Sequence, residues 1–193
     1  MIRGGMKARK HIAGVFRPRT TGQFEIAACM VAREPLLTNT RQIMPQSLHC
    51  TYGHLIFSTK NREPMITGEI ESRLYEYLGG IVRNLKASLI EINGMPDHVH
   101  LLIRESKSIA DQDFMGQLKG DSSRWMNATF TDRPRFSWQA GYGWFSVNPP
   151  DVEVAAGYIQ GQKDHHRKTT FQDEYRKFLR TYRVEFDERY VWD

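Results

Sequence analysis

The chain has 193 residues, 40% of them hydrophobic, and its mean hydropathy of −0.56 is typical of a soluble protein with one core. No apolar run is as long as a membrane span and no charged-then-apolar signal opens the chain, so we expect no membrane partner and a cytoplasmic location. Two cysteines, Cys29 and Cys50, do not provide a disulfide framework, which agrees with a reducing compartment.

The net charge of +5 is concentrated at the start of the chain. Residues 1–43 hold eight Lys and Arg against two Glu, whereas residues 44–193 hold nineteen basic and twenty acidic residues. Residues 1–43 also lack sustained periodicity, and we interpret them as a basic, flexible extension. A natural start at Met44 is an alternative of at least equal weight. Residues 44–193 are expected to form a single domain.

Hydrophobic patterns between residues 49 and 104 predict three strands and one helix. Residues 49–61 are rich in Tyr, Leu, Ile, Phe and Thr, which indicates a first strand. Apolar residues at three- and four-residue spacing predict an amphipathic helix over 70–85. Residues 87–93 and 98–104 predict two further strands, joined by a tight turn at 94–97.

The next segments complete an alternating order. Residues 108–127 predict a second helix, weak or bent because Gly116 and Gly120 are poor helix formers. Residues 136–147 predict a fourth strand interrupted by glycines. The resulting β-α-β-β-α-β order is typical of an α+β fold with an antiparallel sheet and helices on one face, the ferredoxin-like (RRM-like) arrangement.

Two helices are expected at the C-terminal end. The first is predicted from residue 151 to about His165 with Asn148 as its N-cap, and the second begins after its N-cap Thr170. Tyr158 and Gln162 lie four residues apart on the first helix and therefore share one face. A tyrosine hydroxyl can serve as a covalent nucleophile, and a glutamine oxygen is an acceptable ligand of Mg²⁺ or Mn²⁺. A packing tyrosine and a solvated glutamine are the alternatives.

The predicted third strand contains two histidines, in the stretch PDHVHLL. His98 and His100 are separated by one residue, so both side chains project from the same face of a strand. Two imidazoles in this arrangement can bind one metal ion, and two half-buried histidines without a metal are the alternative.

Other side chains are candidates for contact with nucleic acid. Lys60 and Arg62 close the first strand and can reach phosphates, although a solvated loop is an equal alternative. Trp138 and Trp144 stand beside glycines and are better candidates for stacking on unpaired bases than Trp125, which we expect in the core.

Several stretches between Met44 and Asp193 resemble a known family. These are MPQSLHCTYGHLIFSTKNREPMI, GMPDHVHLLI, YIQGQKDHH, TFQDEY and DERYVWD. They are similar to the single-tyrosine HUH transposases of bacterial insertion sequences, the insertion-sequence-200-like transposases, including REP-associated tyrosine transposases. Two histidines followed by a tyrosine and, one helical turn later, a glutamine form the specific part of this pattern.

The resemblance implies a function and a set of site residues. His98, His100 and Gln162 match the ligands of a Mg²⁺ or Mn²⁺ ion, and Tyr158 matches the nucleophile. Family members cut single-stranded DNA at the foot of a hairpin, form a 5′-phosphotyrosine and later rejoin strands. They are usually homodimers.

Two points stay open at this stage. His165 and His166 match a paired histidine of the family, for which helix capping is a safer interpretation than DNA contact. A domesticated or inactive relative that binds hairpin DNA without transposition is the alternative function. The intact set of four matched residues favours the enzyme, whereas glycines such as Gly157 and Gly161 in the tyrosine helix favour the alternative.

Overall fold

The computed structural model describes residues 48–192, and the extension predicted for residues 1–43 lies outside them. In chain order the elements are β1 (Tyr52–Ser58), η1 (Lys60–Arg62), α1 (Gly68–Asn84), β2 (Ser88–Met95), β3 (His98–Arg104), α2 (Asp111–Thr129), β4 (Gly143–Val147), η2 (Pro149–Asp151), α3 (Val152–Gln160), α4 (Gln162–His165) and α5 (Phe171–Thr181). Within residues 48–192, none of the helices combines the length and apolar character that a bilayer crossing requires.

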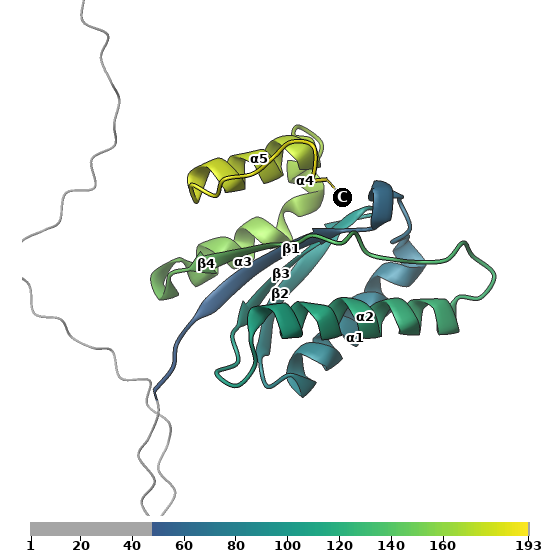
Figure 1. Ribbon diagram of the computed structural model, residues 1–193, viewed down its shortest axis with the longest axis horizontal. Coiled ribbons are helices and arrows are strands. Elements are labelled where there is room, and N and C mark those ends of the chain that lie inside the picture. Colours follow the sequence, from purple (N-terminus) through teal and green to yellow (C-terminus); the bar gives the residue numbers. More distant parts are fainter. Residues whose placement is uncertain (1–47, 193) are drawn as a thin grey trace, which may run out of the picture. The chain divides into compact units, whose positions relative to one another are not determined.

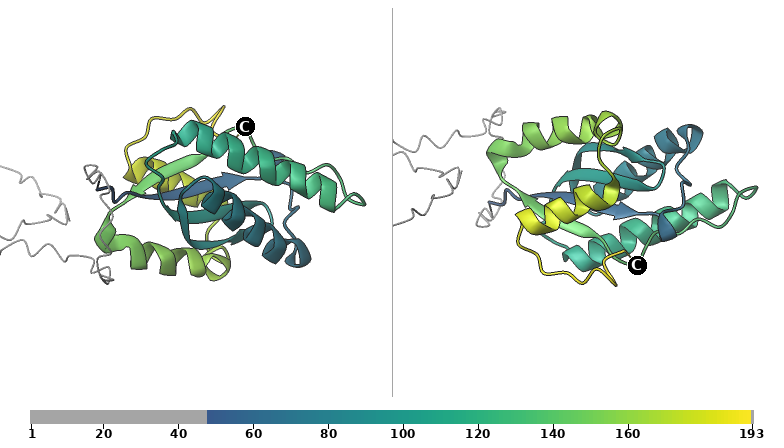
Figure 2. Two further views of the ribbon diagram at one scale, coloured as in Figure 1. Left: turned by 90° about the horizontal axis from the view of Figure 1, so that it is seen from below. Right: turned by 90° about the horizontal axis from the view of Figure 1, so that it is seen from above.

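The four strands form one antiparallel sheet in the order β2-β3-β1-β4. The helices α1 and α2 cover one face, as predicted, and the C-terminal helices α3 to α5 lie on the other face (Figure 1). The views from below and above in Figure 2 show the same two helical layers on either side of the sheet. The central strands β1 and β3 are therefore covered on both sides.

Alternation along β1 and β3 divides the buried side chains between two cores. The larger core contains Leu55, Phe57, Val99, Leu101 and Ile103 of these strands, packed against apolar residues of α1 and α2. On the other face, Ile56 and Phe145 pack against Phe171, Tyr175 and Leu179, while Leu102 packs against Ala156 and Ile159. Since side chains of alternate residues share a face, His98 and His100 lie on the second face.

The turn between β2 and β3 is tighter than predicted. Only Pro96 and Asp97 lie between the strands, and Gly94 is part of β2, opposite Val99. A Cβ atom at Gly94 would collide with the carbonyl oxygen of His98. The glycine therefore permits the close hairpin instead of forming its turn.

The fourth strand is shorter than predicted. Residues 136–142 have no strand beyond an isolated bridge between Thr59 and Trp138, and β4 begins at Gly143. A Cβ atom at Gly143 would meet the rings of Phe145 and Tyr175, so the absence of a side chain permits this packing.

The predicted helix over 151–165 is divided at Gly161 into α3 and α4. Gly161 has a ψ of 6°, outside the helical range, and the change of direction leaves Gln162 fully buried. Asn148 was predicted to be an N-cap, but its side chain does not cap a helix. Its amide instead donates to the carboxylate of Asp151 at 3.2 Å. Thr170 does cap α5, accepting from the Asp173 N–H at 3.2 Å.

The helix α2 runs without interruption through Gly116 and Gly120, so these glycines do not break it. A Cβ atom at Gly116 would meet nothing within 4 Å. Gly116→Ala is therefore expected to stabilise the protein by about 0.5–1 kcal/mol, measured by urea unfolding. Gly94→Ala serves as the contrasting variant and is expected to destabilise it, and a destabilised Gly116→Ala protein would contradict the prediction.

Candidate functional site

Two histidines of β3 form the floor of the candidate site. His98 and His100 lie opposite Ser58 and Ile56 of β1 and are 1% and 0% exposed. Both project from the same face, as their spacing predicts, and that face is the one covered by α3 to α5.

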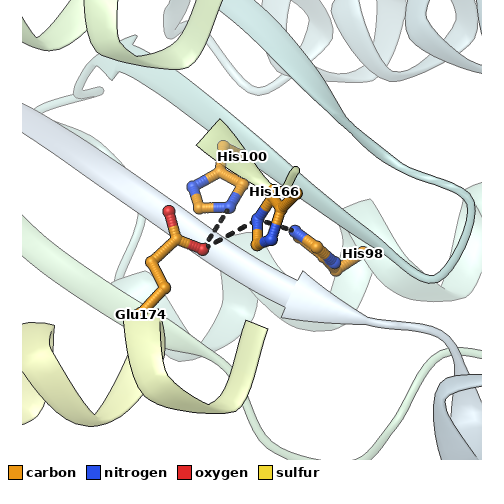
Figure 3. Close-up of side chains that lie close together, drawn as sticks. All are labelled: His98, His100, His166 and Glu174. Atoms are coloured by element: carbon orange, nitrogen blue, oxygen red, sulfur yellow. Dashed lines mark hydrogen bonds and ion pairs between the residues drawn. The ribbon is translucent and has the colours of Figure 1, made fainter. Parts of the chain in front are cut away.

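The C-terminal helices bring two more ligand-type side chains to these histidines. His166 follows α4, and Glu174 lies on α5 and is 2% exposed. One possible ligand atom from each of His98, His100, His166 and Glu174 lies within 4.8 Å of the others. Figure 3 shows the three imidazoles and the carboxylate gathered around one small space, and we call these four residues the histidine–glutamate cluster.

Hydrogen bonds fix the orientation of each imidazole in the cluster. The Nδ1 atom of His98 lies 2.8 Å from an Asp97 carboxylate oxygen. The Nδ1 atom of His100 lies 3.0 Å from Nε2 of His54, and the Nδ1 atom of His166 lies 2.9 Å from the carbonyl oxygen of Thr169. Each ring therefore directs its Nε2 atom toward the interior of the cluster, the usual arrangement when the outer nitrogen is held by a supporting group.

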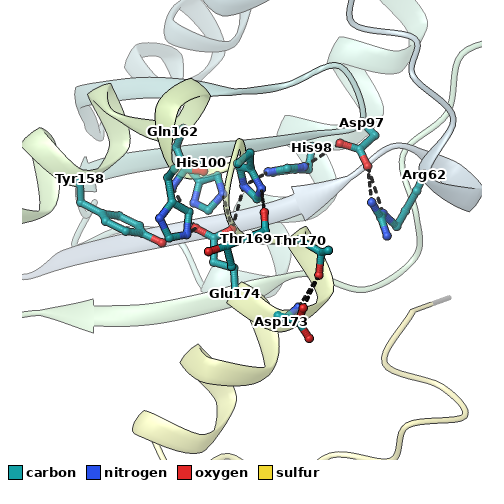
Figure 4. Close-up of polar contacts among 12 residues, drawn as sticks. Arg62, Asp97, His98, His100, Tyr158, Gln162, Thr169, Thr170, Asp173 and Glu174 are labelled. Atoms are coloured by element: carbon teal, nitrogen blue, oxygen red, sulfur yellow. Dashed lines mark hydrogen bonds and ion pairs between the residues drawn. The ribbon is translucent and has the colours of Figure 1, made fainter.

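Tyr158 joins the cluster through Glu174. Its hydroxyl donates to Oε1 of Glu174, and the Nε2 amide of Gln162 donates to the same oxygen at 2.9 Å (Figure 4). Tyr158 and Gln162 thus act on one carboxylate, although they lie on α3 and α4 and not on one continuous helix as predicted.

Burial keeps the imidazoles of His98 on β3 and His54 on β1 neutral near pH 7. Burial lowers the pKa of His98 to about 4 and that of His54 to about 3. Burial alone would raise the pKa of Asp97, but the contacts with His98 and Arg62 outweigh it and hold that pKa at about 2. Neutral imidazoles supported by an ionised carboxylate have lone pairs available for a cation.

The pKa of Glu174 is lowered, whereas that of Tyr158 is raised. Burial alone would raise the pKa of Glu174, but the neighbouring His100 and His166 outweigh it and hold that pKa well below its usual range. Burial, with the hydrogen bond to Glu174, raises the pKa of Tyr158 above its ordinary value. The site therefore contains a carboxylate anion that accepts from a protonated tyrosine hydroxyl.

Acid is expected to destabilise the metal-free protein through His54 and His98. Their folded-state pKa values are lowered, so below pH 6.5 the unfolded chain binds protons that the folded chain excludes. The unfolding free energy therefore decreases as the pH is lowered. Between roughly pH 5.5 and 4.5 each contributes a slope of about 1.4 kcal/mol per pH unit. The pKa of His166 is raised despite its burial, because Glu174 is close, so it is protonated in both states there and contributes almost no slope.

Urea unfolding of a His54→Gln variant measures this effect. The slope of unfolding free energy against pH is expected to be smaller than in the unaltered chain by about 1.4 kcal/mol per pH unit. An unchanged slope would show that His54 does not carry the acid sensitivity.

The cluster contains buried polar atoms that lack partners. Among residues 48–192, Nε2 of His100, Oε1 of Gln162 and Oε2 of Glu174 form no hydrogen bond. Buried polar atoms without partners are costly unless a ligand satisfies them. Imidazole nitrogens with carboxylate and amide oxygens are a donor set for a divalent cation, so the residues present fit a metal ion.

The predicted DNA-contact residues lie in different surroundings. Lys60 is exposed. Arg62 instead donates to Asp97 at 2.7 Å, and the Asp97 carboxylate in turn contacts Nδ1 of His98. Trp138 is buried in the core, where its indole donates to Ser122 at 2.9 Å, so the prediction that it is open to an unpaired base is wrong in this structure.

Trp144 and Trp125 both lie on the side of the sheet opposite the histidines. Trp144 is half-buried on the α2 side of the sheet, with its indole donating to Glu105 at 2.9 Å. Trp125, expected in the core, is half-buried and stacks on Tyr77. Its partly open position suits base stacking better than that of Trp138, although it lies on the helix layer opposite the histidines.

The paired histidines are both close to Glu174. His166 follows α4 at its C-cap position, but its side chain does not cap that helix: its ring faces the cluster with Nε2 3.1 Å from Glu174 Oε2. Nε2 of His165 lies 3.7 Å from Glu174 Oε1.

The sequence interpretation assigned no role to His54 or Glu174. His54 was set aside because it does not share a strand face with His49, yet it supports His100 from the neighbouring strand. Glu174 lies in TFQDEY, one of the stretches that carry the family resemblance, and this was the available signal for it.

Comparison with known proteins identifies the family. Residues 47–162 match the model of the family described as transposase IS200 like. The ISDra2 transposase TnpA of Deinococcus radiodurans is 31% identical over 119 residues, which are 58% of this chain and 83% of that protein. The transposase for insertion sequence element IS200 of Salmonella typhimurium is 29% identical over 124 residues, covering 62% and 80%.

A solved transposase structure from Deinococcus radiodurans R1 has a TM-score of 0.51 at 27% identity, covering 63% of this chain and 98% of that one. The fold and the comparisons together define a protein of DNA transposition. The chain belongs to the IS200-like transposase family. Membership implies an enzyme that cleaves and rejoins DNA.

Proposed function

We propose that this chain is a metal-dependent single-strand DNA transposase that nicks and rejoins hairpin-flanked DNA through a 5′-phosphotyrosine intermediate. The observation that carries the proposal is the position of Glu174, which accepts from the Tyr158 hydroxyl and also adjoins His100. A nucleophile and a metal-type cluster are thereby joined at one buried carboxylate. Membership of the transposase family supplies the reaction class.

The roles follow from the chemistry of each group. Tyr158 is the nucleophile, and His98, His100 and Gln162 are the residues that hold Mg²⁺ or Mn²⁺. A bound divalent cation would stabilise the negative charge that develops on the scissile phosphate. Asp97 and Arg62 keep the His98 ring oriented.

The cleavage step conserves the phosphodiester energy. The Tyr158 oxygen forms a bond to phosphorus, the bond from phosphorus to the 3′ oxygen breaks, and the tyrosine proton leaves so that a free 3′-OH results. A 3′-OH end then attacks the phosphotyrosine, restoring the phosphodiester and the tyrosine hydroxyl. No external energy source is needed, because each step exchanges one phosphate ester for another.

The surroundings offer a path for a DNA strand. A groove of about 570 Å³ is lined by His98 and His166 together with the basic side chains Arg62, Arg167 and Lys168. Basic side chains at the mouth of a groove attract and position a phosphate backbone. We assign the approach of the single strand to this groove as far as the histidines; Tyr158 lines a separate groove of about 480 Å³ together with His54 and Glu174.

The remaining parts of the proposal rest on the family resemblance. The sheet and its first two helices are the ferredoxin-like (RRM-like) arrangement, residues 44–193 form one transposase domain, and residues 1–43 are an added basic extension. The protein acts in the cytoplasm as a homodimer on single-stranded DNA hairpins.

End-labelled single-stranded hairpin oligonucleotides from the DNA flanking the gene test this function. With the full chain and Mg²⁺ or Mn²⁺, we expect a protein–DNA adduct on a denaturing gel, and chelator should abolish it. His100→Ala is expected to lose the adduct, whereas His49→Ala, an exposed histidine outside the cluster, should retain it. Hairpin binding without an adduct under any metal would replace the enzyme with the alternative, a hairpin-binding relative.

A further inference from the structure

We infer that His166 and Glu174 bind the same cation as His98, His100 and Gln162, so that the centre contains three imidazoles and one carboxylate besides the glutamine and is selective for transition-metal ions over Mg²⁺. This inference rests on the proposed function, because it extends the ligand set of that metal site. It adds His166 and Glu174 to the proposed ligands His98, His100 and Gln162.

The distances bring the new donors to the same point as the β3 histidines. Nε2 of His166 lies 3.0 Å from Nε2 of His98 and 3.1 Å from Oε2 of Glu174. Oε2 of Glu174 also lies 3.5 Å from Nε2 of His100. Ligand atoms of one metal ion are typically about 3–3.5 Å apart, because each is about 2.1 Å from the ion. The cluster therefore has the spacing of a coordination shell (Figure 3).

The directions of these groups agree with the distances. His166 and Glu174 approach closely, but Oε2 of Glu174 forms no hydrogen bond among the described residues, and neither does Nε2 of His100. Both side chains are at most 2% exposed, so bulk water does not satisfy these atoms. Oε2 of Glu174 and Nε2 of His100 are therefore aimed at a shared point, whereas Nε2 of His98 and Nε2 of His166 lie within hydrogen-bond distance of each other.

His166 shares one feature with His98 and His100: the Nδ1 atom of its ring also has a hydrogen-bond partner outside the cluster. Its Nδ1 is held by the Thr169 carbonyl, which accepts a proton carried on Nδ1, so that Nε2 is the atom directed at the cluster. Asp97 and His54 hold the corresponding atoms of the other two rings. All three imidazoles are thus supported in the form that binds a metal.

The donor set determines which ion is preferred. Mg²⁺ favours oxygen ligands and retains waters, whereas imidazole nitrogens suit Mn²⁺, Co²⁺ and Zn²⁺. Three imidazoles and one carboxylate therefore favour a transition-metal ion. Because Oε1 of Glu174 accepts from Tyr158 and Gln162 while Oε2 faces the histidines, the same carboxylate also places the tyrosine hydroxyl beside the ion.

Cobalt titration of the metal-free full chain tests the ligand set. Visible absorption of bound Co²⁺ measures affinity and coordination without DNA or catalysis. Glu174→Gln and His166→Gln are each expected to weaken Co²⁺ binding by at least about tenfold and to change the band shape. Glu188→Gln, an equivalent change on an exposed carboxylate, is expected to bind Co²⁺ normally.

The reference variant His100→Ala distinguishes failure of this inference from failure of the proposed metal site. If Glu174→Gln and His166→Gln bind Co²⁺ with unchanged affinity and spectrum while His100→Ala does not bind, this inference is overturned and the proposed metal site stands. If His100→Ala also binds normally, the metal site of the proposed function fails as well.

A measurement on the unaltered protein covers the case in which a variant does not fold. Paramagnetic Co²⁺ shifts the Nδ1 protons of the imidazoles that bind it, and these protons are retained by their hydrogen bonds. Three strongly shifted exchangeable proton signals are expected in the NMR spectrum of the Co²⁺-loaded chain. Two such signals would exclude His166 as a ligand and overturn the inference.

Discussion

The Tyr158→Phe protein is expected to form no covalent adduct with hairpin DNA under conditions where the unaltered chain does. The variant lacks only the hydroxyl, so the attacking oxygen is absent and adduct formation should fall by roughly 10³-fold or more. The ring still packs at the edge of the site against His54 and Phe178, so the fold should be retained. A denaturing gel with labelled hairpin DNA and Mn²⁺ measures the adduct, and Co²⁺ absorption shows that the metal site survives.

A matched tyrosine change controls for the loss of a phenol as such. Tyr190→Phe alters an exposed tyrosine outside the site and should leave adduct formation unchanged. If Tyr158→Phe still forms the adduct at a normal rate, another residue is the nucleophile. If both variants lose it, the defect does not lie in the hydroxyl at position 158.

Leu101→Ala is expected to lower the unfolding free energy by about 2–5 kcal/mol. Leu101 is fully buried in the middle of β3, between Leu55 of β1 and Ile92 of β2 in the sheet register. Its side chain faces α1 and α2, on the side opposite the histidines, so the cavity forms in the main core. Urea unfolding monitored by circular dichroism measures the change.

The exposed Leu48 provides the contrast. It is 86% exposed, so Leu48→Ala should change the unfolding free energy by no more than about 0.5 kcal/mol. A Leu101→Ala protein as stable as Leu48→Ala would show that the β3 core does not carry the stability assigned to it.

Elements with strong local patterns were predictable. The strand at 98–104 has the predicted bounds, because a run of apolar residues with histidines at alternate positions specifies both the strand and its faces. The first helix and the cap at Thr170 also agree with prediction. Helix breaks were not predictable, since Gly116 continues α2 while Gly161 divides α3 from α4.

Tryptophan exposure illustrates the same limit. The residues next to Trp138 and Trp125 in the sequence do not determine whether either side chain is buried or exposed. Ser122 of α2 accepts from the Trp138 indole and Phe57 packs on its ring, so Trp138 is buried, whereas Trp125 lies against Tyr77 at the edge of the helix layer.

By itself, the sequence determined the shared face of His98 and His100, because it depends on a spacing of two residues along a strand, and it carried the resemblance to the transposase family. Tyr158 and Gln162 lie on α3 and α4, on either side of the break at Gly161, and meet only through Glu174. Only the tertiary structure placed His54 behind His100, 46 residues away, and brought His166 to His98 across 68 residues. It likewise brought Glu174 into the same space. Such contacts arise from the docking of helices on a sheet face, and docking depends on packing over the whole core, which no local pattern encodes.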